Sequence, residues 1–400
     1  MEQRARRYRL WLCFALSIRR QRQMCIRDRD KMEQRARRYR LWLCFALGQA
    51  HSRIAALLAH YQEDAEAVFR DAKHHCLPEL NQRDAGLNRQ LYEKAEEGYI
   101  DRCLAYMERH KIQGVLLGDA NYPKLLTQIH RPPTCLYVRG RLPEVIHLPI
   151  AMIGSRNCSE YGKRVAMTMA RDFSSLGVCV VSGLAHGIDG LCAKGALAAV
   201  DNSFPTIAVL GCGVDVVYPP QNRELYEQVV ERGAVVSEFL PGEKPLPAYF
   251  PQRNRIISGL SKGVVVVEAA LHSGTNITVE FALEQNRDVF AIPGRPSDEK
   301  SKGTNRLIKE GNAKSVTDVW DVLEEYDIQP GQRAAPKWID ESRLSLEQTL
   351  LVRLLQAGER NIDELCELTG YNAPEINLAL TDMELSGIIK QSPGRLFSLE

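Results

Sequence analysis

The chain has 400 residues, of which 44% are hydrophobic and 26% charged, and its formal net charge is +2. This is the composition of an ordinary globular protein with room for two or three domains. No apolar run approaches the roughly 20 residues that span a bilayer, and eleven cysteines without a C-x-x-C pair argue against a zinc ribbon or a redox dithiol. We therefore expect a cytoplasmic protein with reduced thiols and no membrane partner.

The first 31 residues differ in charge from the rest of the chain. They hold ten basic and three acidic residues, so that this segment carries +7 and the remainder −5. The segment opens with MEQRARRYRLWLCFAL, which recurs letter for letter at 32–47. Structural repeats diverge in sequence, so the identical copy favours a duplicated, non-native start over a basic arm for nucleic acid or membrane.

Residues 32–110 are predicted to form a small helical domain. Apolar residues recur at helical spacing in LWLCFALGQAHSRIAALLAHY, around 62–72 and in 87–109. The layout is that of a SAM-like or helix-hairpin-helix-like domain, and the poor hairpin turn after Gly48 favours a packing role over a hold on DNA backbone. Residues 111–150, with two adjacent prolines, predict an extended lead-in that docks on the next domain.

Buried-strand and helix patterns alternate between residues 150 and 330. The expected strands are short, nearly continuous apolar runs, typical of strands covered on both faces: 150–154, 178–183, 206–213, 234–239, 263–269 and 288–294. The expected helices between them are 161–176, 188–200, 222–232, 252–260 and 275–286. The alternation predicts an α/β domain at 111–330, a Rossmann-like parallel sheet with helices on both faces.

The C-terminal part predicts a second kind of domain. Residues 331–344 have the composition of a linker, and 345–400 predict a winged helix-turn-helix. Its expected elements are helices 346–357, 361–369 and 373–386 and a hairpin at 388–399. Residues 345–400 hold nine acidic and four basic residues, and the third helix has no Lys or Arg. A protein contact or a structural role is therefore favoured over phosphate binding.

Four of the expected strands end in turns of small residues. Ligands of an open parallel sheet bind beyond the carboxyl ends of its strands, where glycine and serine let backbone approach a phosphate and helix N-termini present free N–H groups. The turns are Gly154-Ser155-Arg156, Ser182-Gly183 continuing to Asp189, Gly211-Cys212-Gly213, and His272-Ser273-Gly274-Thr275. Together they predict an anion-binding groove, although any one glycine is equally explained by tight strand–helix packing.

Basic residues flank these turns. Arg156 carries a planar charge suited to phosphate oxygens or to base stacking. Lys194 follows Asp189 on the next helix, where it reaches the same edge or is simply solvated. A second basic contact is expected in PQRNRIISGLS, from Arg253, Asn254 and Arg255; solvated arginines at a helix start explain that string equally well.

Signals for catalysis or a cofactor are weak. The chain has neither G-x-G-x-x-G nor G-x-x-x-x-G-K-[ST], so dinucleotide and P-loop sites are disfavoured. Neither a carboxylate pair nor a metal-ligand cluster stands out. His186 and Asp189 share a turn without a nucleophile elbow, and Asp189 equally caps the following helix or pairs with Arg156. We expect no catalytic residue, cofactor or metal.

Several strings, in this order, resemble the DNA-processing protein A (DprA, also called Smf) family over about residues 112–322: GSR, SGLAHGID, TIAVLGCGVDVVYPPQNREL, SEFLPG, FPQRNRIISGLS, VVVVEAALHSGTNITVEFALEQNRDVFAIPG and NRLIKEG. The resemblance implies a non-enzymatic, homodimeric protein that binds single-stranded DNA, protects incoming DNA in natural transformation and loads the RecA recombinase. The residues it assigns to DNA are Gly154, Ser155, Arg156, Ser182, Gly183, Asp189, Lys194, Arg253, Asn254, Arg255, Ser273, Gly274 and Thr275.

Two departures and two alternatives accompany this resemblance. Asn276 stands where the family often has Leu or Phe, and His186 where it usually has Arg or Tyr, so a cationic contact is in doubt there at neutral pH. Few aromatic residues lie near the turns, which predicts a small share of base stacking. One alternative is a phosphoribohydrolase-like enzyme, whose acidic residue follows its threonine more closely than Glu280 follows Thr275. The other is a recombinase adaptor whose helical and winged-helix domains carry the partner surface.

Overall fold

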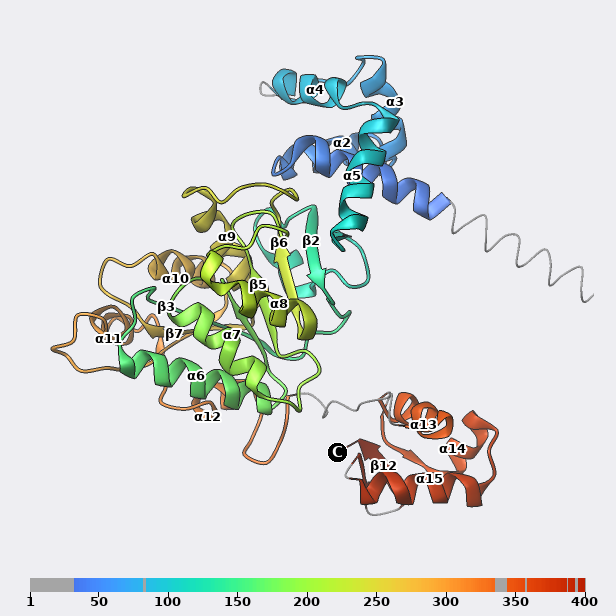
Figure 1. Cartoon of the computed structure of the whole chain (residues 1–400), viewed down its shortest axis with the longest axis vertical. Helices are drawn as coiled ribbons and strands as arrows, with labels where there is room; N and C mark the ends of the chain where they lie inside the picture. Colours follow the sequence, from blue (N-terminus) through green and yellow to red (C-terminus); the bar gives the residue numbers. More distant parts are fainter. Residues whose placement is uncertain are drawn as a thin grey trace, which may run out of the picture. The chain divides into compact units, whose positions relative to one another are not determined.

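The computed structural model describes residues 32–81, 84–334, 344–356, 358–386, 388–392 and 395–399. The predictions for residues 1–31 and for most of the linker at 331–344 lie outside the described residues. The fold divides into two compact units (Figure 1). The first holds the described residues up to 119, with 131–137 and 238–240, and the second holds the other described residues. Within the described ranges, no helix is long and apolar enough to cross a membrane.

The N-terminal part of the first unit, up to Arg109, is helical, as predicted. Residues 32–47 are helical, followed by α2 (His51–His60), α3 (Ala65–Lys73), α4 (Asp84–Glu93) and α5 (Glu97–Arg109). Trp42 is fully buried, its indole N–H donates to the Lys94 carbonyl at 2.8 Å, and its ring meets Phe69 edge-on. The single helix expected over 87–109 is two helices, α4 and α5, because the chain turns at 94–96.

The expected lead-in at 111–150 contains regular structure. It forms β1 (Gln113–Leu116), the 3-10 helix η1 (Lys124–Gln128) and β2 (Cys135–Gly140). All four residues 135–138 of β2 are buried, so its CLYV run is a core strand. Sequence analysis missed these strands because the adjacent prolines dominated the pattern.

A parallel sheet forms the centre of the second unit. Its strands are β3 (Pro149–Gly154), β4 (Cys179–Ser182), β5 (Thr206–Val209), β6 (Ala234–Ser237), β7 (Gly263–Glu268), β8 (Asp288–Ala291) and β9 (Lys314–Ser315). They lie in the order β6-β5-β4-β3-β7-β8-β9, and every neighbouring pair is parallel. The chain reverses its direction of travel across the sheet at β3, which makes the carboxyl end of β3 the topological switch point where ligands bind in such sheets.

Helices cover the sheet on both faces (Figure 1). They are α6 (Glu160–Ser175), α7 (Ile188–Ala198), α8 (Arg223–Arg232), α9 (Tyr249–Gly259), α10 (Thr275–Glu284), α11 (Lys302–Lys309) and α12 (Trp320–Leu323). Val265 and Val267 of β7 pack into one core with α6, α7 and α12. Val264 and Val266 are equally buried and point to the opposite face. The Rossmann-like prediction is confirmed, with all six strands found within a few residues of their expected ends.

Residues 344–399 form a winged helix with a core of its own. It consists of α13 (Leu346–Gln356), β10 (Arg360–Asn361), α14 (Ile362–Thr369), α15 (Ala373–Leu385), β11 (Ile389–Ser392) and β12 (Leu396–Leu399). Leu351, Leu365, Ile376 and Phe397 are among the buried residues that fill it. Asn361 and Asn372 each begin a helix with a capping box. The predicted winged helix is confirmed.

Candidate nucleic-acid interface

The turns that follow β3 and β4 are joined by backbone hydrogen bonds. The Ser155 N–H donates to the Glu268 carbonyl at 2.9 Å, and the Ile188 N–H donates to the Ser155 carbonyl at 3.2 Å. A Cβ on Gly154 would lie 2.7 Å from Ile188 Cγ1, so only glycine permits this approach. The structure therefore brings the first two predicted turns together at the switch point.

Asp189 holds the second turn from inside. It is 8% exposed, and its Oδ2 accepts a hydrogen bond from the Gly183 N–H at 3.1 Å. Burial raises the pKa of this carboxyl, against the opposing influence of the Arg253 charge. The N-cap of α7 is Gly187, so Asp189 is not the cap of that helix. Asp189 thus stabilises the turn from a nearly buried position.

Arg253 differs from the expectation of an open basic contact. It is only 4% exposed, and its Nη1 donates to the carbonyls of Gly183 at 2.7 Å and Val209 at 2.5 Å. Helix α9 begins at Tyr249, earlier than predicted, so Arg253 lies inside the helix. Its side chain is on the helix face that packs against the sheet. The guanidinium therefore ties together the turns after β4 and β5.

Two other predicted contacts, Ser182 and Thr275, are fully or nearly buried. Ser182 is fully buried, so its side chain is out of reach of DNA. Thr275 is 8% exposed and its hydroxyl is hydrogen-bonded to Ser273 Oγ at 2.9 Å. Gly274 remains open, since a Cβ there would meet nothing within 4 Å. The side-chain amide of Asn276 donates to the Leu271 carbonyl at 2.9 Å, so this departure from the family pattern holds the turn.

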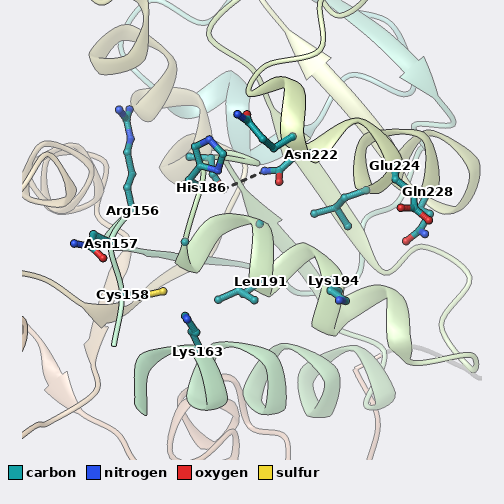
Figure 2. Close-up of a pocket in the computed structure, with 15 residues that line it drawn as sticks. Arg156, Asn157, Cys158, Lys163, His186, Leu191, Lys194, Asn222, Glu224 and Gln228 are labelled. Atoms are coloured by element: carbon teal, nitrogen blue, oxygen red, sulfur yellow. Dashed lines mark hydrogen bonds between the residues drawn. The ribbon is translucent and has the colours of Figure 1, made fainter. Parts of the chain in front are cut away.

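A polar cleft of about 770 Å³ lies beside α7 (Figure 2). Its lining includes the exposed cations Arg156, Lys163 of α6 and Lys194 of α7, together with the exposed His186. Lys163 pairs with Glu160 at 2.7 Å, and this hydrogen bond raises the pKa of Lys163. Lys163 was missed in the sequence because it lies within a helix, with no turn motif around it.

A second, aromatic cleft of about 740 Å³ is also lined by Arg156. Tyr218 and Phe250 line it, together with Asn254 and the open turn at Ser273 and Gly274. The Arg156 guanidinium lies 5.3 Å from the centre of the Phe250 ring, and the Tyr218 ring lies 5.5 Å from Phe250. Tyr218 is 38% exposed. Two aromatic residues therefore lie beside the turns, and the small share of base stacking stays a prediction.

Arg156 connects the two clefts. It is exposed and lines both of them, as Asn157 and Ala185 do. Arg255 is half-buried and lines neither. The surface thus offers cations, open backbone and aromatic rings, the groups that bind the phosphates and bases of a single strand. Among the residues that the structure describes, no group of three or more His, Cys, Asp or Glu could hold a metal ion.

Known proteins share this architecture and sequence. The family model described as "DNA recombination-mediator protein A" matches residues 113–327, and that of the "DprA winged helix domain" matches 334–395. Protein Smf of Escherichia coli is 38% identical over 303 residues, which cover 74% of this chain and 79% of that protein. DNA processing protein DprA of Streptococcus pneumoniae is 42% identical over 229 residues, covering 57% of this chain and 79% of that protein.

A solved structure agrees with these relatives. The X-ray structure of DprA from Streptococcus pneumoniae superposes with a TM-score of 0.63 at 34% identity, covering 73% of this chain and 99% of that one. One family model spans more than half of the chain, and the E. coli relative matches most of both proteins. The chain therefore belongs to the DNA recombination-mediator protein A family, also called DprA or Smf.

Proposed function

We propose that this protein binds single-stranded DNA, without reading its sequence, along the polar and aromatic clefts. The observation that carries the proposal is the position of Arg156, exposed at the boundary of both clefts and stacked near Phe250. A strand that crosses Arg156 would lay phosphates near Lys163 and Lys194 on one side and bases near the two aromatic rings on the other.

The chemistry of the surface favours a single strand over a duplex. Base faces are exposed for stacking only when a strand is unpaired, and each stacked base contributes about 1–3 kcal/mol. Exposed Arg and Lys side chains supply a sequence-independent attraction to phosphates. Phe250 and Tyr218 therefore account for the preference for single strands, and the three cations for the salt dependence.

We propose that the protein acts in the cell as a recombination mediator. Relatives carry the name DNA processing protein, and the family model is described as a recombination mediator. The proposed role is to protect incoming single-stranded DNA during natural transformation and to load RecA recombinase onto it. We propose a cytoplasmic homodimer that works by binding alone, with no catalytic residue or cofactor.

The binding proposal is tested by fluorescence anisotropy with a labelled thymidine oligonucleotide and a duplex of equal length, titrated over a range of salt concentrations. We expect tighter binding of the single strand than of the duplex. The logarithm of the binding constant should fall linearly with the logarithm of the salt concentration. Arg156→Ala should weaken binding and reduce the salt slope by about 1. Arg171→Ala is the matched control, because Arg171 is an exposed arginine of α6 that lines neither cleft. Equal affinity of wild type and Arg156→Ala would contradict the proposal.

The recombinase role requires a separate experiment. RecA filament growth on oligonucleotide coated with single-stranded DNA-binding protein should accelerate when this protein is added. Arg156→Ala should abolish that acceleration in proportion to its loss of DNA affinity. Full acceleration by a variant that no longer holds DNA would favour the adaptor alternative, in which DNA contact is secondary.

A further inference from the structure

Glu268 is a buried carboxylate beneath the interface. It is the last residue of β7 and is 1% exposed, so DNA cannot reach it. Its Oε2 accepts a hydrogen bond from the Ser159 N–H at 2.8 Å, and its Oε1 accepts one from the Ser159 hydroxyl. Ser159 is the N-cap of α6 and also accepts from the Gly162 N–H at 3.0 Å. The carboxylate thus holds the start of α6.

The backbone of Glu268 holds the other end of the same segment. Its carbonyl accepts from the Ser155 N–H at 2.9 Å. The pairing of β3 with β7 shifts register between Ile153 and Gly154, which sets Gly154 opposite Glu268. One residue therefore fixes both ends of the segment 155–159.

Neighbouring glycines make room for this arrangement. A Cβ on Gly162 would lie 2.7 Å from the Glu268 Oε2, and one on Gly154 would lie 3.0 Å from its carbonyl oxygen. Between the two fixed ends, Arg156 and Asn157 are exposed. Segment 155–159 is therefore closely packed at both ends and exposed between them. This arrangement would hold Arg156 in a fixed position at the surface.

We propose that Glu268 is a positioning residue for single-stranded DNA, which holds segment 155–159 so that Arg156 faces both clefts. The inference rests on the proposed DNA-binding function. A segment that is already ordered does not lose conformational freedom when it binds, so its contacts contribute more to affinity.

The first test uses two substitutions of different chemistry. Glu268→Met keeps the length of the side chain and removes both acceptors, whereas Glu268→Gln can still accept from the Ser159 N–H and donate to its hydroxyl. We expect Glu268→Met to lose as much affinity for the thymidine oligonucleotide as Arg156→Ala, with the same reduction of the salt slope. Glu268→Gln should stay within about twofold of wild type. The double variant Arg156→Ala/Glu268→Met should bind no more weakly than Arg156→Ala alone, because both remove the same contact.

Limited proteolysis provides a readout without DNA. Trypsin cleaves after arginine, so the rate of cleavage between Arg156 and Asn157 reports directly on the order of the segment. Cleavage there should be several-fold faster in Glu268→Met than in wild type or Glu268→Gln. If Glu268→Met does not fold, Ser159→Ala serves in its place, since it removes the hydroxyl contact to Glu268, together with the cap on the Gly162 N–H, and keeps the Ser159 N–H bond to Glu268. Asp64→Ala is the matched control, because it removes an N-cap from α3, a helix whose residues line neither cleft.

The outcomes separate the two proposals. Unchanged cleavage after Arg156 in a folded Glu268→Met variant, or additive losses of affinity in the double variant, would overturn the positioning role. Faster cleavage together with wild-type affinity in both Arg156→Ala and Glu268→Met would support the positioning role and remove Arg156 from the proposed interface.

Discussion

Two arginines lie near the ring of Phe250, and their burial decides what each can do. The guanidinium groups of Arg156 and Arg253 are 5.3 and 5.8 Å from the ring centre. Arg253 is buried and donates to two backbone carbonyls, whereas Arg156 is exposed. A guanidinium with donors already used by the fold has fewer to offer a phosphate. We therefore expect Arg156 to contribute binding energy through contact with DNA, and Arg253 to maintain the shape of the site.

Gly183 is predicted to tolerate no side chain. A Cβ there would lie 2.4 Å from Arg253 Nη1 and 2.6 Å from Asp189 Oδ2. Gly183→Ala should lower the free energy of unfolding by roughly 1–3 kcal/mol through overpacking, measured by urea unfolding followed by circular dichroism. Gly274→Ala is the matched control: nothing lies within 4 Å of its Cβ position, so stability should change by less than about 1 kcal/mol. Equal stability of the two variants would contradict the assigned packing.

The burial of Asp189 predicts how the stability of the protein depends on pH. Burial raises its pKa above the ordinary 3.8, despite the Arg253 charge. The folded protein then binds a proton more readily than the unfolded chain, so the contribution of this group to stability is complete below pH 3.8 and is lost as the pH rises through the folded-state pKa. Wild type should therefore gain stability relative to Asp189→Asn as the pH falls through the window above 3.8.

Urea unfolding of wild type and Asp189→Asn at pH 7 and at about pH 4.5 measures this difference. Other titrating groups are common to both proteins and cancel in the comparison. A relative loss of wild-type stability on acidification would show that the charge of Arg253 outweighs burial, and that Asp189 is held as an ion in the folded protein.

At the level of elements, the sequence predicted the sheet well and the surface of the site less well. Each strand is a short apolar run that can be recognised from its own residues, and every predicted strand of the 150–330 region is present. The burial of Arg253 depends on which face of α9 packs against the sheet, and the string Arg253-Asn254-Arg255 does not show this. Tyr218 and Phe250 are far apart in sequence and meet only in the folded chain.

The buried carboxylate illustrates the same limit. Glu268 ends a run of four valines, and an acidic residue at the end of a buried strand is a visible signal. Its role depends on Ser159, more than a hundred residues away, and on a register shift between β3 and β7. Local patterns predict elements; the partners of a buried polar group follow only from the assembled sheet.

For the whole molecule, net charge is a poor guide to DNA binding. The value of +2 combines a +7 N-terminal segment with a −5 remainder. Within that acidic remainder, the three cations Arg156, Lys163 and Lys194 gather around one cleft. The winged helix adds nine acidic and four basic residues, with no Lys or Arg on α15. Local arrangement therefore sets the affinity for phosphates, and the winged helix is expected to contribute nothing to it.

This expectation is tested by a chain that ends at Ala334. The Ala334 N–H donates to the Leu176 carbonyl at 2.7 Å, so the truncation keeps this contact between the start of the linker and the α/β domain. Because the salt slope counts the cations that neutralise phosphates, it should be the same with and without the winged helix. Affinity should be equal or, with an acidic domain removed, somewhat higher. Thermal denaturation checks that the truncated chain is folded. A lower affinity with a shallower slope would show instead that Arg353, Arg360, Lys390 or Arg395 contacts DNA in the full-length protein.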